Sequence, residues 1–321
     1  MSQKTTPATP QNKPGPGYSP QFPTPPIPLP TIPEILHSAY RSAFDPHDPK
    51  NPKHMLVRHG SDGETVEFAQ TRVHSHFRVI FGPHVKASDA YAAHFVSQNT
   101  TIPVQKTYAV LYDPDTKFTF IVYEYLEDAT QLSRLWTNKK FKNKCIATIA
   151  GYVKQLRSIP SPGWFGTVDG KLITDPFASG KWFNPDLKEY PPACTTGYGW
   201  VHTLLNTMQT MHGIGPTRKK WLTDVMHAAL DPSSGPEQAV FTHPTFGIGS
   251  FFWRDSDKTI VWADWFGAGF APKYWQYCTV MARSPPKYVE SETVIWHRIL
   301  EPFLLEYAWV DKYYSWLDRG K

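Results

Sequence analysis

The chain contains little cysteine and no long apolar run. Its 321 residues include only three cysteines, Cys145, Cys194 and Cys278, which lie far apart in the sequence. An odd number at this spacing argues against a disulfide framework and provides no CxxC motif, so we expect a protein of the reducing cytoplasm. No stretch of 18 apolar residues could form a membrane-spanning helix. The first 20 residues also lack the apolar core of a secretory signal.

The chain also lacks a large excess of charge of one sign. The 33 Lys and Arg residues nearly balance the 28 Asp and Glu residues, which leaves a net charge of +5. No nucleic-acid-binding motif accompanies this small excess, so it predicts ordinary solubility and no nucleic-acid partner. Aromatic residues are abundant at 15%, with 12 Trp. A chain of this length can bury a large core, in one large domain or two packed lobes.

Proline gathers at the start of the chain. Eleven of the 31 prolines fall within residues 1–33, where no hydrophobic periodicity is visible. Such a composition predicts a disordered, extended and solvated leader. The stretch Pro23-Thr24-Pro25-Pro26 has a second interpretation, as a ligand for a groove that reads polyproline II.

Residues 34–126 have the pattern of a strand-rich N-terminal lobe with one inserted helix. Alternation of apolar and polar residues predicts strands over 64–68, 77–81, 106–112 and 118–125. A helical stripe covers 88–98, with Ser88 as the expected N-cap.

Residues 127–321 read as a larger, mainly helical C-terminal lobe. The expected helices cover 141–157, 200–213, 217–230 and 291–318. Strand-like pieces at 250–253 and 259–263 flank a polar turn and predict a hairpin. Together the two parts predict an α+β fold with two lobes.

This layout and four short stretches resemble the aminoglycoside phosphotransferase and choline kinase-like family, which has a protein-kinase-like fold. The resemblance is closest to the fungal members and covers roughly residues 50–315. The stretches are Thr101-Ile102-Pro103-Val104, Ile121 to Leu126, Leu156 to Pro160, and Phe241 to Ser250 followed by Asp264-Trp265. It implies a linker between the lobes at Glu124 and Leu126, and a ligand-binding cleft beside it.

The resemblance also implies where phosphotransfer groups should stand. Such enzymes use a third-strand lysine on the phosphates, a helix carboxylate, a catalytic Asp, and an Asn and an Asp that hold magnesium. With His243 setting the register of the loop, these positions fall in turn on Ile80, Asp89, Thr245, Ser250 and Asp264. Only Asp89 and Asp264 are carboxylates, and Asp264 is the one remaining metal ligand. Isoleucine cannot hold a phosphate, and a threonine hydroxyl is not basic near neutral pH.

The leading hypothesis is therefore a catalytically degenerate, pseudokinase-like protein, with a small molecule in its cleft or a protein partner. ATP and magnesium are expected only if kinase function remains. One alternative is an active phosphotransferase with relocated groups, for which Arg78 shares the strand face of Ile80. Another is a different enzyme in the same cleft, using His243 with Asp264, or a pair at His74 and His76.

Two further patterns have a plain and a functional interpretation. His74 and His76, with His84 near in sequence, could hold a metal ion, but an exposed strand face is the simpler reading. The basic run at 138–144 could bind an anion, but a solvated start of a helix explains it equally.

Overall fold

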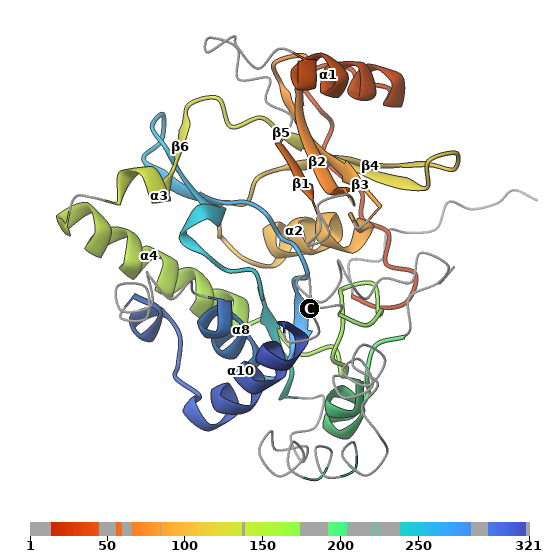
Figure 1. Ribbon diagram of the computed structural model, residues 1–321. Coiled ribbons are helices and arrows are strands. Elements are labelled where there is room, and N and C mark those ends of the chain that lie inside the picture. The colour runs from red at the N-terminus through yellow and green to blue at the C-terminus, as the bar shows by residue number, and fades with distance from the viewer. Residues whose placement is uncertain are drawn as a thin grey trace, which may run out of the picture.

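The computed structural model describes residues 14–44, 56–59, 66–83, 85–136, 139–173, 192–203, 220, 224, 238–283 and 295–318. In this part of the chain, a strand-rich N-terminal lobe lies against a larger lobe that carries most of the helices (Figure 1). The predicted two-lobed α+β fold is confirmed.

The N-terminal lobe is built on one antiparallel sheet. Its strands lie in the order β1-β2-β3-β5-β4. Their bounds are β1 Leu56–His59, β2 Val66–Val73, β3 Phe77–Gly82, β4 Thr107–Asp113 and β5 Phe118–Glu124. The four predicted strands are confirmed with shifted ends, and β1 was not predicted. Alternation along β3 places Val79 in the cluster on one face and Ile80 in the cluster on the other.

A helix on each face covers this sheet (Figure 1). Helix α1, Ile32–Phe44, buries Ile35 against the outer face, and α2, Ala87–Asn99, lies on the side of the second lobe. Helix α1 begins with a capping box, in which the Thr31 backbone N–H donates to Glu34 at 2.7 Å. Sequence analysis missed this helix, because its first turn was included in the leader.

The N-cap predicted for α2 is wrong. Lys86, with an extended backbone, occupies that position, and Ser88 lies inside the first turn at 8% exposure. The side chain of Lys86 makes no capping hydrogen bond.

The described part of the leader, residues 14–31, is extended but not solvated throughout. The Tyr18 side chain is only 6% exposed and makes edge-to-face contacts with Tyr91 and Phe95 on α2. The Gly15 N–H donates to the Val168 carbonyl of the C-terminal lobe at 2.8 Å. The prediction of a solvated tail is therefore wrong at Tyr18, which joins the main core, while most of the other residues in 14–31 are exposed as expected. The preceding 13 residues lie outside the described part.

Replacing Tyr18 with alanine should weaken this attachment. We expect a loss of about 2 kcal/mol, less than for a central aromatic residue, because the leader can detach while the lobes stay folded. Urea unfolding measures the loss, and Tyr112→Ala, at a 60% exposed tyrosine, is the matched control. Equal midpoints for the two variants would contradict the docked leader.

The C-terminal lobe combines helices with two small sheets. Its described helices include α3 Leu132–Leu135, α4 Lys139–Arg157, α8 Trp275–Arg283 and α10 Leu304–Asp318. One sheet has the order β6-β8-β9, formed by Ala129–Gln131, Phe251–Arg254 and Thr259–Trp262. The second pairs β7, Val240–Thr242, with β10, Gly269–Ala271. The hairpin of β8 and β9 confirms the one predicted from the sequence.

The helix predicted over 291–318 is not continuous. Residues 295–299 are helical, and α10 begins only at Leu304. Pro302 explains the break, since it has no N–H for a helical hydrogen bond. Of the two other predicted helices, 200–213 is helical over its described residues 200–203, while 217–230 lies outside the described residues except for 220 and 224.

The two histidines of the suspected metal site lie in a turn rather than on a strand face. His74 has a positive φ of 50° in the connection between β2 and β3, and His76 is exposed beside it. His76 Nδ1 lies 2.6 Å from the His74 carbonyl, and His74 Nε2 lies 3.7 Å from the Glu34 carboxylate of α1. His84 lies outside the described residues. Nowhere in the described part do three His, Cys, Asp or Glu residues form a group that could hold a metal ion.

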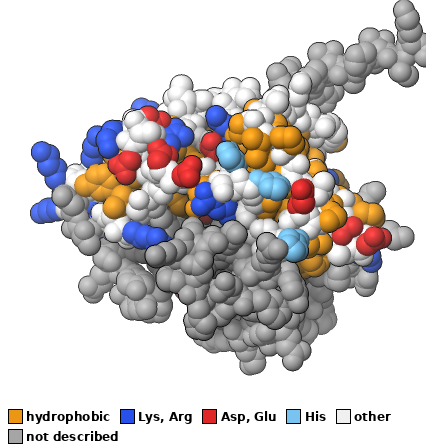
Figure 2. All heavy atoms as spheres, turned by 90° about the horizontal axis from the view of Figure 1, so that it is seen from above, with side chains coloured by type: hydrophobic (Ala, Val, Ile, Leu, Met, Phe, Trp, Pro, Cys, Tyr) orange, Lys and Arg blue, Asp and Glu red, His pale blue; other side chains and the backbone are white. Residues whose placement is uncertain are grey.

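On the face shown in Figure 2, charge of both signs is present. Seen from above, basic and acidic side chains are interspersed with apolar ones (Figure 2). The basic run starts α4, where Lys142 lies over the ring of Trp136 at 5.4 Å and Lys144 over Trp253 at 5.6 Å. None of the described helices is long and apolar enough to cross a membrane.

Candidate functional site

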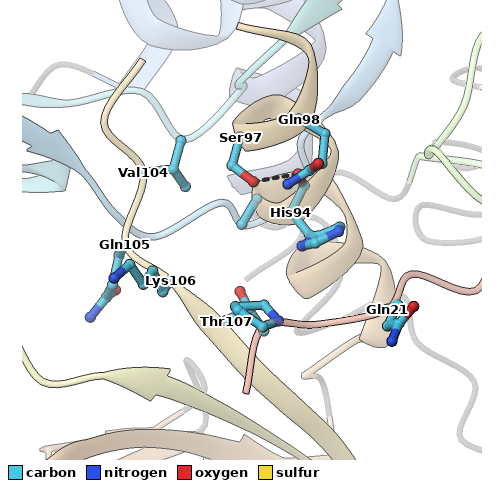
Figure 3. Close-up of a pocket in the computed structure, with 10 residues that line it drawn as sticks. Gln21, His94, Ser97, Gln98, Val104, Gln105, Lys106 and Thr107 are labelled. Carbon is cyan, nitrogen blue, oxygen red and sulfur yellow. Dashed lines mark hydrogen bonds between the residues drawn. The ribbon is translucent and has the colours of Figure 1, made fainter. Parts of the chain in front are cut away.

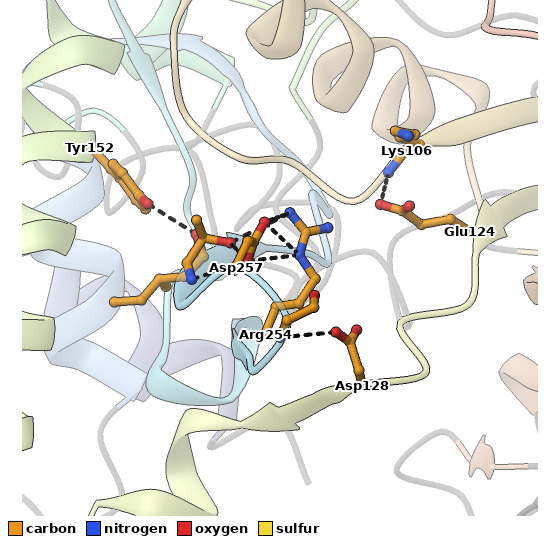
Figure 4. A network of polar contacts seen from close by, with 9 residues as sticks. Lys106, Glu124, Asp128, Tyr152, Arg254 and Asp257 are labelled. Carbon is orange, nitrogen blue, oxygen red and sulfur yellow. Dashed lines mark hydrogen bonds and ion pairs between the residues drawn. The ribbon is translucent and has the colours of Figure 1, made fainter.

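Several contacts join the two lobes, and the chain that links them after β5 is itself held by hydrogen bonds. After α2, the Trp262 N–H of β9 donates to the Pro103 carbonyl at 2.8 Å, and the Gln105 N–H donates to the Trp262 carbonyl at 3.0 Å. After β5, the Asp128 carboxylate accepts a hydrogen bond from the Ser256 N–H at 3.1 Å (Figure 4). The β8–β9 turn is itself stiffened by Arg254, whose hydrogen bonds hold the pKa of Asp257 well below its usual range.

An ion pair connects the lobes through Arg78 of β3 and Asp264, which follows β9. Arg78 Nη2 lies 2.5 Å from Asp264 Oδ1. The arginine side chain is 14% exposed and the aspartate side chain 32% exposed. Arg78 also donates to the side-chain oxygens of Gln70 at 2.9 Å and Gln105 at 3.0 Å. The guanidinium is thus held by three acceptors and points at the carboxylate for which the resemblance implies a metal-binding role.

Gln105 links this ion pair to the connection between the lobes. Gln105 is only 2% exposed, and its Nε2 donates a hydrogen bond to the Glu124 carbonyl at 2.8 Å. The Glu124 carboxylate in turn accepts the Lys106 N–H at 2.9 Å (Figure 4). Leu126, two residues on, is half-buried.

The loop that starts at His243 is held by aromatic packing. The His243 ring is fully buried, stacked on Trp262 with centroids 5.2 Å apart and edge-on to Trp265 at 5.1 Å. Its Nδ1 lies 3.3 Å from the Thr245 hydroxyl, which also donates to the Phe266 carbonyl at 3.0 Å. These contacts brace the loop through His243, and they tie the Thr245 hydroxyl to the loop.

Two further positions that the resemblance singles out, Ile80 and Ser250, are both buried. Ile80 is 3% exposed and packs with Val85, Ala90 and Ile121. Ser250 is 8% exposed, and its carbonyl accepts the Ala263 N–H at 2.8 Å.

Asp89 lies in the first turn of α2 and faces the C-terminal lobe. It is 2% exposed, and Oδ1 accepts the Gly267 N–H at 2.9 Å. Within the described residues Oδ2 has no hydrogen-bond partner. Burial raises the pKa of Asp89 to about 6, and Lys86 opposes this shift.

The raised pKa of Asp89 predicts a specific pH dependence. The native state keeps this proton between about pH 4 and 6, where the unfolded chain releases it, so the contribution of Asp89 to stability falls as pH rises through that window. Asp89→Asn keeps an acceptor for Gly267 without the charge. We expect it to be about 1–3 kcal/mol more stable than the native protein at pH 7.5 and about equal at pH 4.

Urea unfolding at both pH values measures the difference. Asp113→Asn is the control, because the Thr116 hydroxyl lowers the pKa of this exposed carboxyl. Its substitution should lose stability relative to the native protein as pH rises, the opposite sign. A pH-independent difference for Asp89→Asn would contradict the raised pKa.

Most of the predicted site residues meet at one segment, residues 263–267. Ser250 bonds to its first residue, Arg78 to Asp264, Thr245 to Phe266 and Asp89 to Gly267. Asp264 itself adopts a left-handed backbone with φ of 59°, which costs a non-glycine residue about 1–2 kcal/mol. Gln70 and Gln105 were not predicted from the sequence, because no local signal marks a glutamine whose partners come from other strands of the N-terminal lobe.

No protein-family description matches the chain, and no curated protein matches it. Solved structures do. A thermostable mutant of aminoglycoside phosphotransferase APH(4)-Ia in its apo form is similar, with a TM-score of 0.52, 13% identity, and coverage of 83% of this chain and 88% of that one. Another form of that enzyme, in ternary complex with ADP and hygromycin B, has a TM-score of 0.50, 12% identity and the same coverage. The chain therefore has the two-lobed, kinase-like fold of aminoglycoside phosphotransferases.

Proposed function

We propose that the protein is a kinase-like protein that does not transfer phosphate, and that its interlobe cleft binds a small molecule. The observation that carries this proposal is the ion pair of Arg78 with Asp264 at 2.5 Å. The carboxylate that the resemblance assigns to a metal is neutralised by an arginine of the same chain. The likeness to fungal members remains a prediction.

The environment of the other positions supports this proposal. The Thr245 hydroxyl is engaged by Phe266 and His243, and it offers no carboxylate to receive a proton. Ile80 fills an apolar cluster and provides no cation. A positioned general base contributes about 10²–10⁴-fold to an enzymatic rate. Its loss, together with that of the phosphate-binding lysine, leaves little of a phosphotransfer rate.

The residues fit magnesium and ATP poorly. Magnesium in such sites is held through one or two carboxylates together with the phosphates, but Asp264 already pairs with Arg78, and a serine stands at position 250. A cation there would have to displace the guanidinium from its carboxylate. We propose instead that the interlobe cleft holds a small molecule without a metal ion. A protein partner, in place of a small molecule, is the alternative occupant of the cleft.

One observation favours a second candidate, an active phosphotransferase with relocated groups. Arg78 brings a cation to the strand face of Ile80, from where it could hold a phosphate if it left Asp264. A third possibility, another reaction using His243, is less well supported, because that ring is fully buried and lies against two tryptophans.

An ADP-release assay with ATP, magnesium and a panel of aminoglycosides that includes hygromycin B tests the proposal. We expect that adding an aminoglycoside does not raise ADP release above the background measured without an acceptor. Acceptor-dependent release that is lost in Asp264→Ala, and kept in the control Asp115→Ala at an exposed turn, would instead establish the active phosphotransferase.

A further inference from the structure

A recess lies between the leader, α2 and the residues that lead into β4. It has a volume of about 650 Å³, within the range of pockets that hold small organic ligands. Figure 3 shows His94, Ser97 and Gln98 of α2 on one side, Val104 to Thr107 on the other, and Gln21 of the leader. We call this recess the α2–β4 pocket. Arg78, Asp264, Thr245 and Ser250 do not line it.

The leader forms one wall of the pocket and is anchored beside it. The Phe22 ring meets His94 edge-on with centroids 5.4 Å apart, and lies 6.3 Å from the ring of Tyr91. Tyr18 of the leader is buried against the same helix, α2, where it contacts Tyr91. The wall is therefore part of the folded protein.

The lining of the pocket favours a negatively charged ligand. None of its residues is acidic, and Lys106 brings one positive charge, while Gln21, Gln98 and Gln105 supply amides. Burial lowers the pKa of His94, so that its ring is neutral at pH 7. Glu124 is bonded to two of the lining residues, Gln105 and Lys106, and its carboxylate already accepts the backbone N–H of Lys106.

Thr107 adds an unsatisfied group to this lining. Thr107 is 3% exposed, and its hydroxyl has no hydrogen-bond partner among the described residues. It lies where the register of β4 against β5 shifts, a bulge of the kind that redirects a side chain. A buried hydroxyl without a partner is costly, and an acceptor atom of a ligand could satisfy it.

We propose that the α2–β4 pocket binds an organic anion of metabolite size, through a carboxylate or phosphate group that interacts with Lys106 and Thr107. Gln105 lines this pocket and also bonds to Arg78, so the pocket adjoins the interlobe cleft, but the proposal does not depend on the function proposed for that cleft.

Calorimetric titration of the whole chain with citrate, glucose 6-phosphate and glucose tests the site, at an ionic strength matched with chloride. We expect saturable binding of citrate or glucose 6-phosphate, which distinguishes a carboxylate from a phosphate ligand, and none of uncharged glucose. Thr107→Val and Lys106→Met should each weaken the affinity about five- to tenfold. Lys154→Met, at an exposed lysine of α4, should bind as the native protein does.

Thr107→Val is nearly isosteric and removes an unsatisfied buried group, so its unfolding midpoint without ligand should be at least that of the native protein. Lys106 is exposed, so its substitution tests the site without touching the core. The absence of saturable anion binding would overturn the proposal. So would native affinity in both variants, or binding that is lost in Arg78→Met but kept in Lys106→Met, which would place the anion in the cleft.

Discussion

Trp262→Ala should cause the largest loss of stability of any substitution considered for this protein, about 3–5 kcal/mol. The side chain is fully buried and contacts His243, Phe246, Phe251 and Trp265, with centroids 4.8–5.4 Å apart. Removing it leaves a cavity under the loop that starts at His243 and beside the backbone contacts that join the lobes. Urea unfolding measures the loss.

Trp253→Ala is the matched control on the neighbouring strand. That side chain is only partly buried, and its indole N–H bonds to Asp255 in the exposed turn. We expect a loss of about 1 kcal/mol. A similar loss in both variants would contradict the central position given to Trp262.

Arg78→Met should cause the second largest loss, about 2–4 kcal/mol. The substitution keeps much of the apolar stem but removes the donors to Asp264, Gln70 and Gln105. Asp264 is about one-third exposed, so water can solvate the stranded carboxylate, which keeps the loss below that of a fully buried pair.

A double-mutant cycle with Asp264→Asn isolates the ion pair. Because the two side chains are in direct contact, we expect a coupling free energy of about 1–3 kcal/mol between the two substitutions. Purely additive losses would show that the pair does not hold the lobes together.

Local patterns predicted the N-terminal sheet well but not its boundaries with the leader. Strand β3 alternates cleanly, so its two faces could be assigned from the sequence alone. The helix α1 carries a readable signal, the Thr31–Glu34 capping box, which the surrounding prolines obscured. The positive φ of His74 was not visible, because a left-handed turn there depends on how β2 and β3 pair.

The candidate site was only partly readable, because its contacts join distant parts of the chain. Arg78 and Asp264 are 186 residues apart, and nothing local to either predicts the other. The strand face of Arg78 was predicted correctly, but its role as the partner of Asp264 needs the docked lobes. No sequence pattern marks Gln105 as a site residue either. Its hydrogen bonds to Arg78 and Glu124 form only when β3, β5 and the linker are assembled.

The binding of ATP with and without magnesium tests the proposed loss of phosphotransfer most directly. Calorimetric titration of the native protein and of Asp264→Asn should give the same ATP affinity, weak or absent, whether or not magnesium is added. ATP affinity that rises steeply with magnesium in the native protein, and loses that rise in Asp264→Asn, would show that Asp264 leaves Arg78 to hold a metal, and would contradict the proposed loss.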